Sequence, residues 1–423
     1  MENIIKTYPS GLRIIVRNMP NFKSVATSVY VGVGSRDELE TEHGLSHFVE
    51  HMLFKGTTTR TAEQIAQTLS SLGVEYNAYT SNTATCYHTR GLNSNLNECC
   101  DILSDMYFNL RFEEADFRRE AEVIVQEIAM RDDNPQWCLS ELCGETFFAG
   151  TPYGHNIAGT IKSVRSFKPQ DIHSYVRKHY TAPNTIIAFS GDVTLQQAEV
   201  MVKKYWLAHY KDEVKPNLRV LEDKKIVPAQ AFAKRQKSTE QQNVAVLFPV
   251  CNNNHPDKYK LTFINEILSA DMSSRLFISV RDKLGLVYGI SGGVHLNNVG
   301  GYYYIWFSCT PGNTELVLKT IASEITRFKV GGPTEEEIRK VKNIKKSERL
   351  FEAENVEQTN QRNAAFLSEY NSIETPEEYL EKINKIGMAD VLDTVRKYLS
   401  YENAIVAIVG KSIKVKPFSI LRD

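Results

Sequence analysis

An internal repeat with a period of 219 residues constrains this 423-residue sequence more than any other feature. The segment DIHSYVRKHYTAPNTIIAFSGDV, from Asp171, aligns without gaps with DVLDTVRKYLSYENAIVAIVGKS, from Asp390. Each copy has the pattern of a helix, a polar turn and an apolar strand that ends in glycine. Identities in one register favour duplication over chance, so two similar halves are predicted. The identities pair Asp171, Val176, Arg177, Lys178, Asn184 and Gly191 with Asp390, Val395, Arg396, Lys397, Asn403 and Gly410.

The repeat also predicts domain boundaries and a fold class. A charged segment with Pro216 and Pro228 separates the halves, which gives domains at 1–210 and 239–423 and a linker at 211–238. In the first half we expect strands near 11–17 and 24–33, a hairpin over VEYNAYT and ATCYHTRG, and mainly helices from about 94 to 148. This order indicates two homologous α+β domains, each a mainly antiparallel sheet packed with helices.

The charge balance argues against nucleic acid or a membrane as a partner. Lys and Arg total 50 and Asp and Glu total 51, whereas both partners call for a basic surplus. The sequence has no run of about 18 apolar residues, and the charged Glu2 start is unlike a secretory signal. Seven cysteines without a Cys-x-x-Cys pair are expected to be free thiols. We therefore expect a cytoplasmic protein.

The stretch GLSHFVEHMLFKGT, residues 44–57, places three polar side chains on an otherwise apolar helix. His47 and His51 are four residues apart, on one helical face, and Glu50 is on their side. Burial of such groups costs on the order of several kcal/mol unless something compensates. Two imidazoles at this spacing can share a zinc ion, which keeps a position for water at catalytic sites. Surface or hydrogen-bonded core histidines have the same spacing, so that interpretation stays open here.

A third metal ligand would have to come from another segment. In FRREAEVIVQEIAMRDDNP, Glu120 and Glu127 are seven residues apart, two turns along one helical face. Glu127 has Ile124 and Ile128 as neighbours, among which an uncompensated carboxylate is unfavourable. Glutamates spaced by seven are also common on solvated helix faces. The segment EEEIRKVKNIKKSER, from Glu335, is interpreted as such a solvated face.

Together these residues carry a family resemblance. The sequence His47-x-x-Glu50-His51, with Glu120 and Glu127 downstream, resembles the inverted zinc-peptidase motif His-x-x-Glu-His. The family is that of pitrilysin, insulin-degrading enzyme and the mitochondrial processing peptidase. The resemblance extends to NAYTS, EIAMRDDNP and SSRLFISVRDKLGLVYG and covers essentially the whole chain. It implies a short, two-domain member of bacterial type.

The resemblance implies a role for each motif residue. His47, His51 and Glu127 would bind Zn²⁺, and Glu50 would be the general base. Glu120 would be a carboxylate outside the ligand set that orients a histidine ligand or supports Glu127. The chemistry agrees, because zinc lowers the pKa of its water toward about 7 and a nearby carboxylate can accept the proton.

The second half lacks this motif. The 219-residue offset places Glu266, Ser269 and Ala270 at the positions of the motif residues, so this half is predicted to be non-catalytic. By resemblance, Arg281 and Tyr288 contact the substrate main chain and help to stabilise the oxyanion. A structural arginine at a helix end and a half-buried tyrosine are the alternative.

Three further residues are assigned to substrate binding by the resemblance. Asn77, Ala78 and Thr80 would lie on an edge strand that pairs with the substrate, as strand addition requires. An ordinary hairpin strand is the alternative.

The resemblance implies a zinc-dependent endopeptidase that hydrolyses unstructured peptides or small extended polypeptides. Larger relatives join four such domains in one chain, so a chain with two domains is expected to form a homodimer. The alternative is the catalytic subunit of a heterodimer with a related, metal-less chain. A non-catalytic scaffold and a metal-binding regulatory module are the rival functions, and the intact motif argues against the scaffold.

Overall fold

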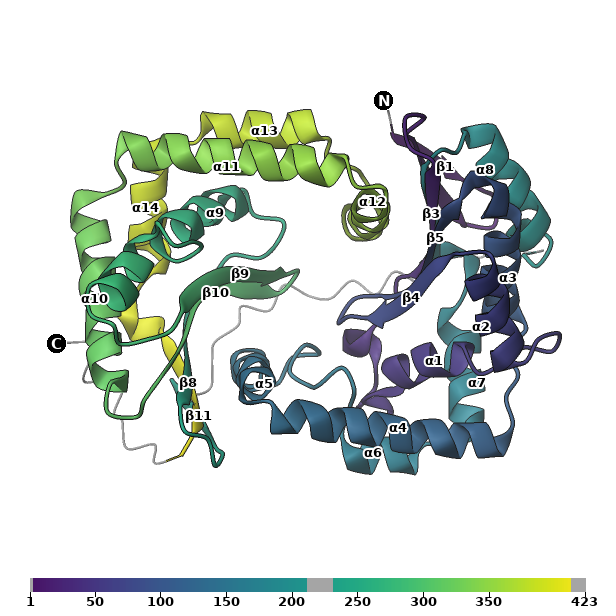
Figure 1. Cartoon of the computed structure of the whole chain (residues 1–423), viewed down its shortest axis with the longest axis horizontal. Helices are drawn as coiled ribbons and strands as arrows, with labels where there is room; N and C mark the ends of the chain where they lie inside the picture. The colour runs from purple at the N-terminus through teal and green to yellow at the C-terminus, as the bar shows by residue number, and fades with distance from the viewer. Residues whose placement is uncertain (1–2, 211–230, 412–423) are drawn as a thin grey trace. The chain divides into compact units, whose positions relative to one another are not determined.

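The computed structural model describes residues 3–210 and 231–411, which form two compact units (Figure 1). Of the described residues, the first unit contains 3–129, 155–210 and 349–375. The second unit contains 130–154, 231–348 and 376–411. Most of the segment interpreted as a linker, 211–230 of 211–238, lies outside the described residues.

A six-stranded sheet forms the centre of the first unit, in the order β1-β2-β6-β3-β5-β4. The pair β2–β6 is parallel, and the other neighbouring strands are antiparallel. The outermost strand β4 pairs with β5 in a register that places Thr80 opposite Thr85. The strands are β1 (Asn3–Thr7), β2 (Arg13–Asn18), β3 (Ser24–Val31), β4 (Glu75–Thr80), β5 (Thr85–Leu92) and β6 (Thr185–Gly191).

The second unit repeats this sheet in five strands, in the order β7-β11-β8-β10-β9. A shift of 219 residues carries β2, β6, β3, β5 and β4 onto segments that overlap these five strands, in the same order. The predicted class, two α+β domains with mainly antiparallel sheets, is thus confirmed. The strands are β7 (Phe232–Gln236), β8 (Gln242–Val250), β9 (Ile290–Asn297), β10 (Gly300–Cys309) and β11 (Ile405–Gly410).

Helices cover both faces of each sheet. In the first unit they are α1 (Leu45–Leu53), α2 (Ala62–Ser71), α3 (Leu96–Phe108), most of α4 (Glu114–Asp133), α6 (Ile161–Ser166), α7 (Pro169–His179), α8 (Leu195–Val202) and α12 (Val356–Tyr370). In the second unit they are α5 (Pro135–Phe147), α9 (Asp257–Leu268), α10 (Thr314–Gly331), most of α11 (Glu335–Ala353), α13 (Pro376–Lys385) and α14 (Met388–Tyr398).

Two equivalent helices are exchanged between the halves of the sequence. Helix α5 comes from the first half and packs on β7, β8 and β11 of the second sheet. Helix α12, its counterpart 219 residues later, packs on β3 and β6 of the first sheet. Leu139 accordingly belongs to the apolar cluster of the second sheet, and Leu367 to that of the first. The boundaries predicted from the sequence, 1–210 and 239–423, do not include this exchange, because a repeat does not report which sheet a helix covers.

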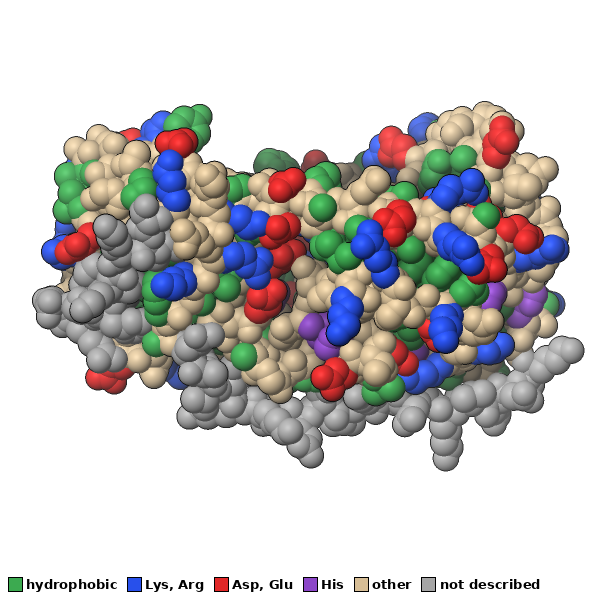
Figure 2. Space-filling model, turned by 90° about the horizontal axis from the view of Figure 1, so that it is seen from below, with side chains coloured by type: hydrophobic (Ala, Val, Ile, Leu, Met, Phe, Trp, Pro, Cys, Tyr) green, Lys and Arg blue, Asp and Glu red, His purple; other side chains and the backbone are tan. Residues whose placement is uncertain are grey.

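The surface charge and the helix composition of the described residues can be compared with the sequence. Figure 2 shows Lys and Arg side chains interspersed with Asp and Glu side chains over the viewed face, as expected from their totals of 50 and 51. Among the residues that the structure describes, no helix is both long and apolar enough to cross a membrane.

Candidate active site

Helix α1 carries the His-x-x-Glu-His sequence between the sheet and α4. Its apolar side is fully buried, with Phe48, Val49 and Met52 at 0% exposure. The helix lies next to β4 of the first sheet (Figure 1). The burial of this apolar face holds the polar face of α1 in place, because rotation of the helix would expose the buried side chains to water.

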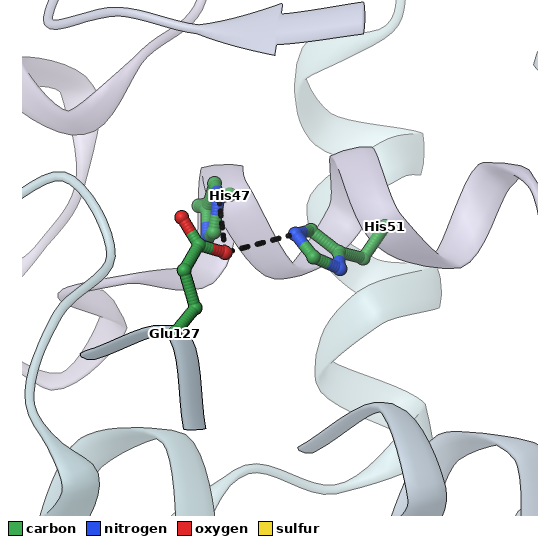
Figure 3. A group of neighbouring side chains, drawn as sticks. All are labelled: His47, His51 and Glu127. Atoms are coloured by element: carbon green, nitrogen blue, oxygen red, sulfur yellow. Dashed lines mark ion pairs between the residues drawn. The ribbon is translucent and has the colours of Figure 1, made fainter. Parts of the chain in front are cut away.

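His47, His51 and Glu127 converge on one point (Figure 3). The Nε2 atoms of His47 and His51 each lie 3.6 Å from Oε2 of Glu127, and the potential ligand atoms of the three residues all lie within 4.8 Å of one another. Ligands at about 2.0–2.1 Å from a tetrahedral zinc ion are roughly 3.3–3.4 Å apart. The two distances to Glu127 are therefore close to this spacing, and the three side chains could hold one zinc ion.

Glu120 fixes the orientation of the second histidine. Its Oε1 lies 2.8 Å from Nδ1 of His51, on the side of the ring opposite to the nitrogen that faces Glu127. Its Oε2 forms a 2.6 Å ion pair with Lys55. A metal-binding histidine usually donates its other ring N–H to a carboxylate, which sets its tautomer and ring plane. The position of Glu120 matches that arrangement.

The electrostatics of the cluster favour a cation. Burial lowers the pKa of His51, but hydrogen bonds to Glu120 and Glu127 outweigh burial and raise this pKa to about 9. Burial also raises the pKa of Glu120, whereas its bonds to His51 and Lys55 lower it, with a net decrease. The carboxylates around α1 thus stabilise positive charge at this point, and a divalent ion would supply it. Two imidazoles and a carboxylate form a donor set that suits zinc.

Glu50 lies one residue before His51 and faces β4. Its Oε2 accepts a hydrogen bond of 2.5 Å from Oγ1 of Thr80. Glu50 is absent from the set of converging ligand atoms, His47, His51 and Glu127. The arrangement therefore brings a carboxylate close to a potential metal site without making it a ligand.

A buried glutamate outside the predicted motif holds the N-terminus of α1. Oε2 of Glu38 accepts a 2.9 Å bond from the N–H of Gly44, and Oε1 accepts a 2.7 Å bond from that of Ser46. The Glu38 side chain has 0% exposure and lies 3.2 Å from Nε2 of His155. An acidic side chain at a helix N-terminus is a recognisable signal. Here, however, it is outside the three-residue spacing of a capping box, and only the fold brings it there.

The residues assigned to substrate contact lie on different units. Asn77, Ala78 and Thr80 are on the edge strand β4 of the first unit. Arg281 and Tyr288 belong to the second unit, where Nε of Arg281 donates a 2.8 Å bond to the C=O of Tyr288. The structural alternative expected a half-buried tyrosine, but Tyr288 is 88% exposed.

An ion pair occupies the equivalent place in the second unit. Glu266, at the position of His47, forms a 2.6 Å bond with Nζ of Lys345 on α11, the counterpart of α4. Their side chains are only 7% and 13% exposed. Burial lowers the pKa of Lys345, but bonds to Glu266 and Glu348 raise it, with a net increase. The interpretation of this helix as a solvated face is therefore wrong at Lys345, which points inward to a carboxylate.

Comparison with known proteins agrees with the fold and identifies a peptidase family. The family model described as insulinase, peptidase family M16, matches residues 13–161. The model described as the peptidase M16 inactive domain matches residues 166–345. A protease from Helicobacter pylori has the same fold, with a TM-score of 0.90, 21% identity, and coverage of 97% of this chain and 99% of that one.

Two relatives in sequence match over nearly their whole length. An uncharacterized zinc protease of Rickettsia felis is 32% identical over 402 residues, which is 94% of this chain and 95% of the relative. An uncharacterized zinc protease of Bacillus subtilis is 29% identical over 407 residues, which is 96% of this chain and 98% of the relative. By these matches, the chain belongs to the insulinase family of peptidases, family M16.

Proposed function

We propose that the protein is a zinc-dependent endopeptidase of the His-x-x-Glu-His type. The observation that carries this proposal is the convergence of His47, His51 and Glu127 beside the carboxylate of Glu50. The names of the Rickettsia felis and Bacillus subtilis relatives, zinc proteases, support the same metal and the same reaction class.

The proposed mechanism assigns the ion to the three converging side chains and the proton transfers to Glu50. When bound, a zinc ion supplies a Lewis acid for the scissile carbonyl and acidifies a water molecule. Glu50 accepts a proton from the attacking water and then donates it to the leaving amine, the usual contribution of a general base and acid. Glu120 keeps the His51 ring in place through its bond to Nδ1.

The open edge of β4 is the proposed binding site for substrate main chain. The N–H of Ser81 donates to the C=O of Ala84 at 2.8 Å, so this pair is hydrogen-bonded. Bonded and non-bonded pairs alternate in an antiparallel ladder, which directs the backbone groups of Ala78 and Thr80 to the open edge. The N–H of Ala78 now bonds to Oδ1 of Asn77 at 2.9 Å, a bond that a paired substrate strand would replace.

Strand addition predicts a preference for extended substrates. We expect a disordered peptide of some tens of residues to be cut much faster than a stable folded protein of similar length, because a folded protein cannot offer a free strand to β4. Mass spectrometry of the products over time measures both rates. Equal rates on the two substrates would contradict the proposed binding mode.

The same assay separates the rival functions. Cleavage that a chelator abolishes and zinc restores supports the endopeptidase. Zinc binding without cleavage would point to a regulatory module, and neither binding nor cleavage would point to a scaffold.

We also propose that two copies of the chain assemble, with Arg281 and Tyr288 of one copy serving the site of the other. The family resemblance implies that in four-domain relatives the metal domain comes first and the domain with this pair comes last, and two copies of a two-domain chain would reproduce that order. A symmetric dimer gives both sites the same surroundings. A heterodimer with a related, metal-less chain is the alternative.

Subunit exchange tests the shared site. His51→Ala and Tyr288→Phe are each expected to be poorly active alone. After exchange, half of the dimers are mixed and each mixed dimer has one intact site, so activity is expected to rise to about a quarter of the wild-type value. Activity that stays at the sum of the two variants, although mass spectrometry shows exchange, would exclude action on the partner's site.

A further inference from the structure

We propose that the side chain of Thr80 is a positioning residue for the Glu50 carboxylate. This inference rests on the proposed function, in which Glu50 is the general base. Oγ1 of Thr80 lies 2.5 Å from Oε2 of Glu50, between the edge strand β4 and the helix α1. Hydrogen bonds from a neutral donor to an ionised carboxylate are shorter and stronger than those between neutral groups. The bond therefore ties the plane of the carboxylate to the strand.

The backbone holds the Thr80 hydroxyl in place from both sides. Thr80 is the last residue of β4 and is paired with Thr85 of β5. The turn that follows is closed by the bond from the N–H of Ser81 to the C=O of Ala84 and by Oγ of Ser81, which donates to the same carbonyl at 3.1 Å. A β-branched side chain on such a fixed backbone has few rotamers. The hydroxyl is thus a rigid donor, and the Glu50 side chain is the flexible partner.

The position of Thr80 couples substrate binding to the base. Successive residues of a strand point to opposite faces, so Thr80 and Ala78 share the face that packs toward α1. The same two residues direct their backbone groups to the open edge, where the substrate strand is proposed to pair. Thr80 therefore sets the distance between the paired substrate and the carboxylate. A displacement of about 1 Å between reacting groups can lower a rate by about 100-fold.

Three variants test the role. Thr80→Val removes the hydroxyl and keeps the shape, Thr80→Ser keeps the hydroxyl, and Thr83→Val removes a hydroxyl from the turn of the same hairpin, where it lies 3.5 Å from Oγ of Ser81. We expect Thr80→Val to lower kcat by about 10- to 100-fold, up to the loss caused by a displacement of about 1 Å between reacting groups. KM, bound zinc and the thermal midpoint are expected to stay at wild-type values. Thr80→Ser is expected to recover most of kcat, and Thr83→Val to behave as wild type.

A double variant gives the sharpest comparison. If Thr80 acts through Glu50, Glu50→Gln/Thr80→Val is expected to be no slower than Glu50→Gln alone. A further 10-fold loss in the double variant, a wild-type kcat in Thr80→Val, or a change confined to KM would each overturn the inference.

The same set distinguishes failure of the inference from failure of the proposed function. An inactive Glu50→Gln beside a fully active Thr80→Val would overturn the role of Thr80 and leave the general base in place. A zinc-loaded Glu50→Gln with wild-type kcat would overturn the general base, and with it the role of Thr80.

Discussion

Replacing Glu50 with glutamine is expected to abolish most peptide hydrolysis while bound zinc stays near one ion per chain. Glutamine keeps the size of the side chain and can still accept a bond from Thr80, but it cannot take a proton from water. General base and acid catalysis contributes about 10²- to 10⁴-fold, so kcat should fall by at least about 100-fold. Zinc is retained because the converging ligand atoms belong to His47, His51 and Glu127. Steady-state kinetics beside metal analysis of the same sample measures both quantities.

Two further variants control for loss of charge and loss of metal. Glu122→Gln changes an exposed glutamate of α4, which pairs with Arg165 at the surface, and should leave kcat and zinc unchanged. His51→Ala should lose both zinc and activity, because it removes one of the three converging side chains. If Glu50→Gln hydrolyses peptides at the wild-type rate with zinc bound, the base is another group.

Local sequence signals are sufficient to recognise an element whose structure is determined within one segment. Helix α2 begins at a capping box of Thr61 and Gln64, a signal contained in one segment, and is followed by Gly73 at φ 66°, a conformation that suits glycine. Strand β1 was not predicted, and β7 lies within 211–238, so the predicted linker boundary is wrong at this strand. The sequence of β7, FAKRQ, has only two apolar residues, and β1 is the exposed outer strand of its sheet. Such edge strands carry little of the alternating pattern that identifies a strand.

The candidate site also contains some residues that local sequence identifies and others that only the tertiary structure brings together. His47, Glu50 and His51 are recognisable because helical spacing alone puts them on one face. The residue pattern made Glu120 and Glu127 candidates, and the family resemblance assigned the ligand role to Glu127. Glu38 and Lys55 could not be found, because their partners are brought to them by tertiary structure. Helical periodicity places a residue on a face, but it does not report what lies opposite that face.

In the second unit, the ion pair of Glu266 and Lys345 lies at the position equivalent to the metal-binding residues, and its contribution to stability can be tested. Lys345→Met is expected to lower the free energy of unfolding by about 3–5 kcal/mol, because it leaves the carboxylate of Glu266 buried without its partner. Lys346→Met, one residue further on the same helix and exposed to solvent, should change it by less than about 0.5 kcal/mol. Urea unfolding monitored by a probe in the second unit measures the difference.

Removing both partners distinguishes destabilisation by an unpaired buried charge from destabilisation by a general packing defect. In Glu266→Leu/Lys345→Met no buried charge is left unpaired, because Glu348, which also pairs with Lys345, is 57% exposed. Replacing a whole buried ion pair by apolar side chains is often neutral or stabilising by about 1–4 kcal/mol. The double variant should therefore be at least as stable as the wild type, although each single variant is less stable. If the double variant is as unstable as the sum of the singles, the helices α9 and α11 depend on the charges themselves. In that case the ammonium of Lys345 would be required as a cation between the two helices. It would lie at the position that corresponds to the candidate metal ligands His47, His51 and Glu127 of the first unit.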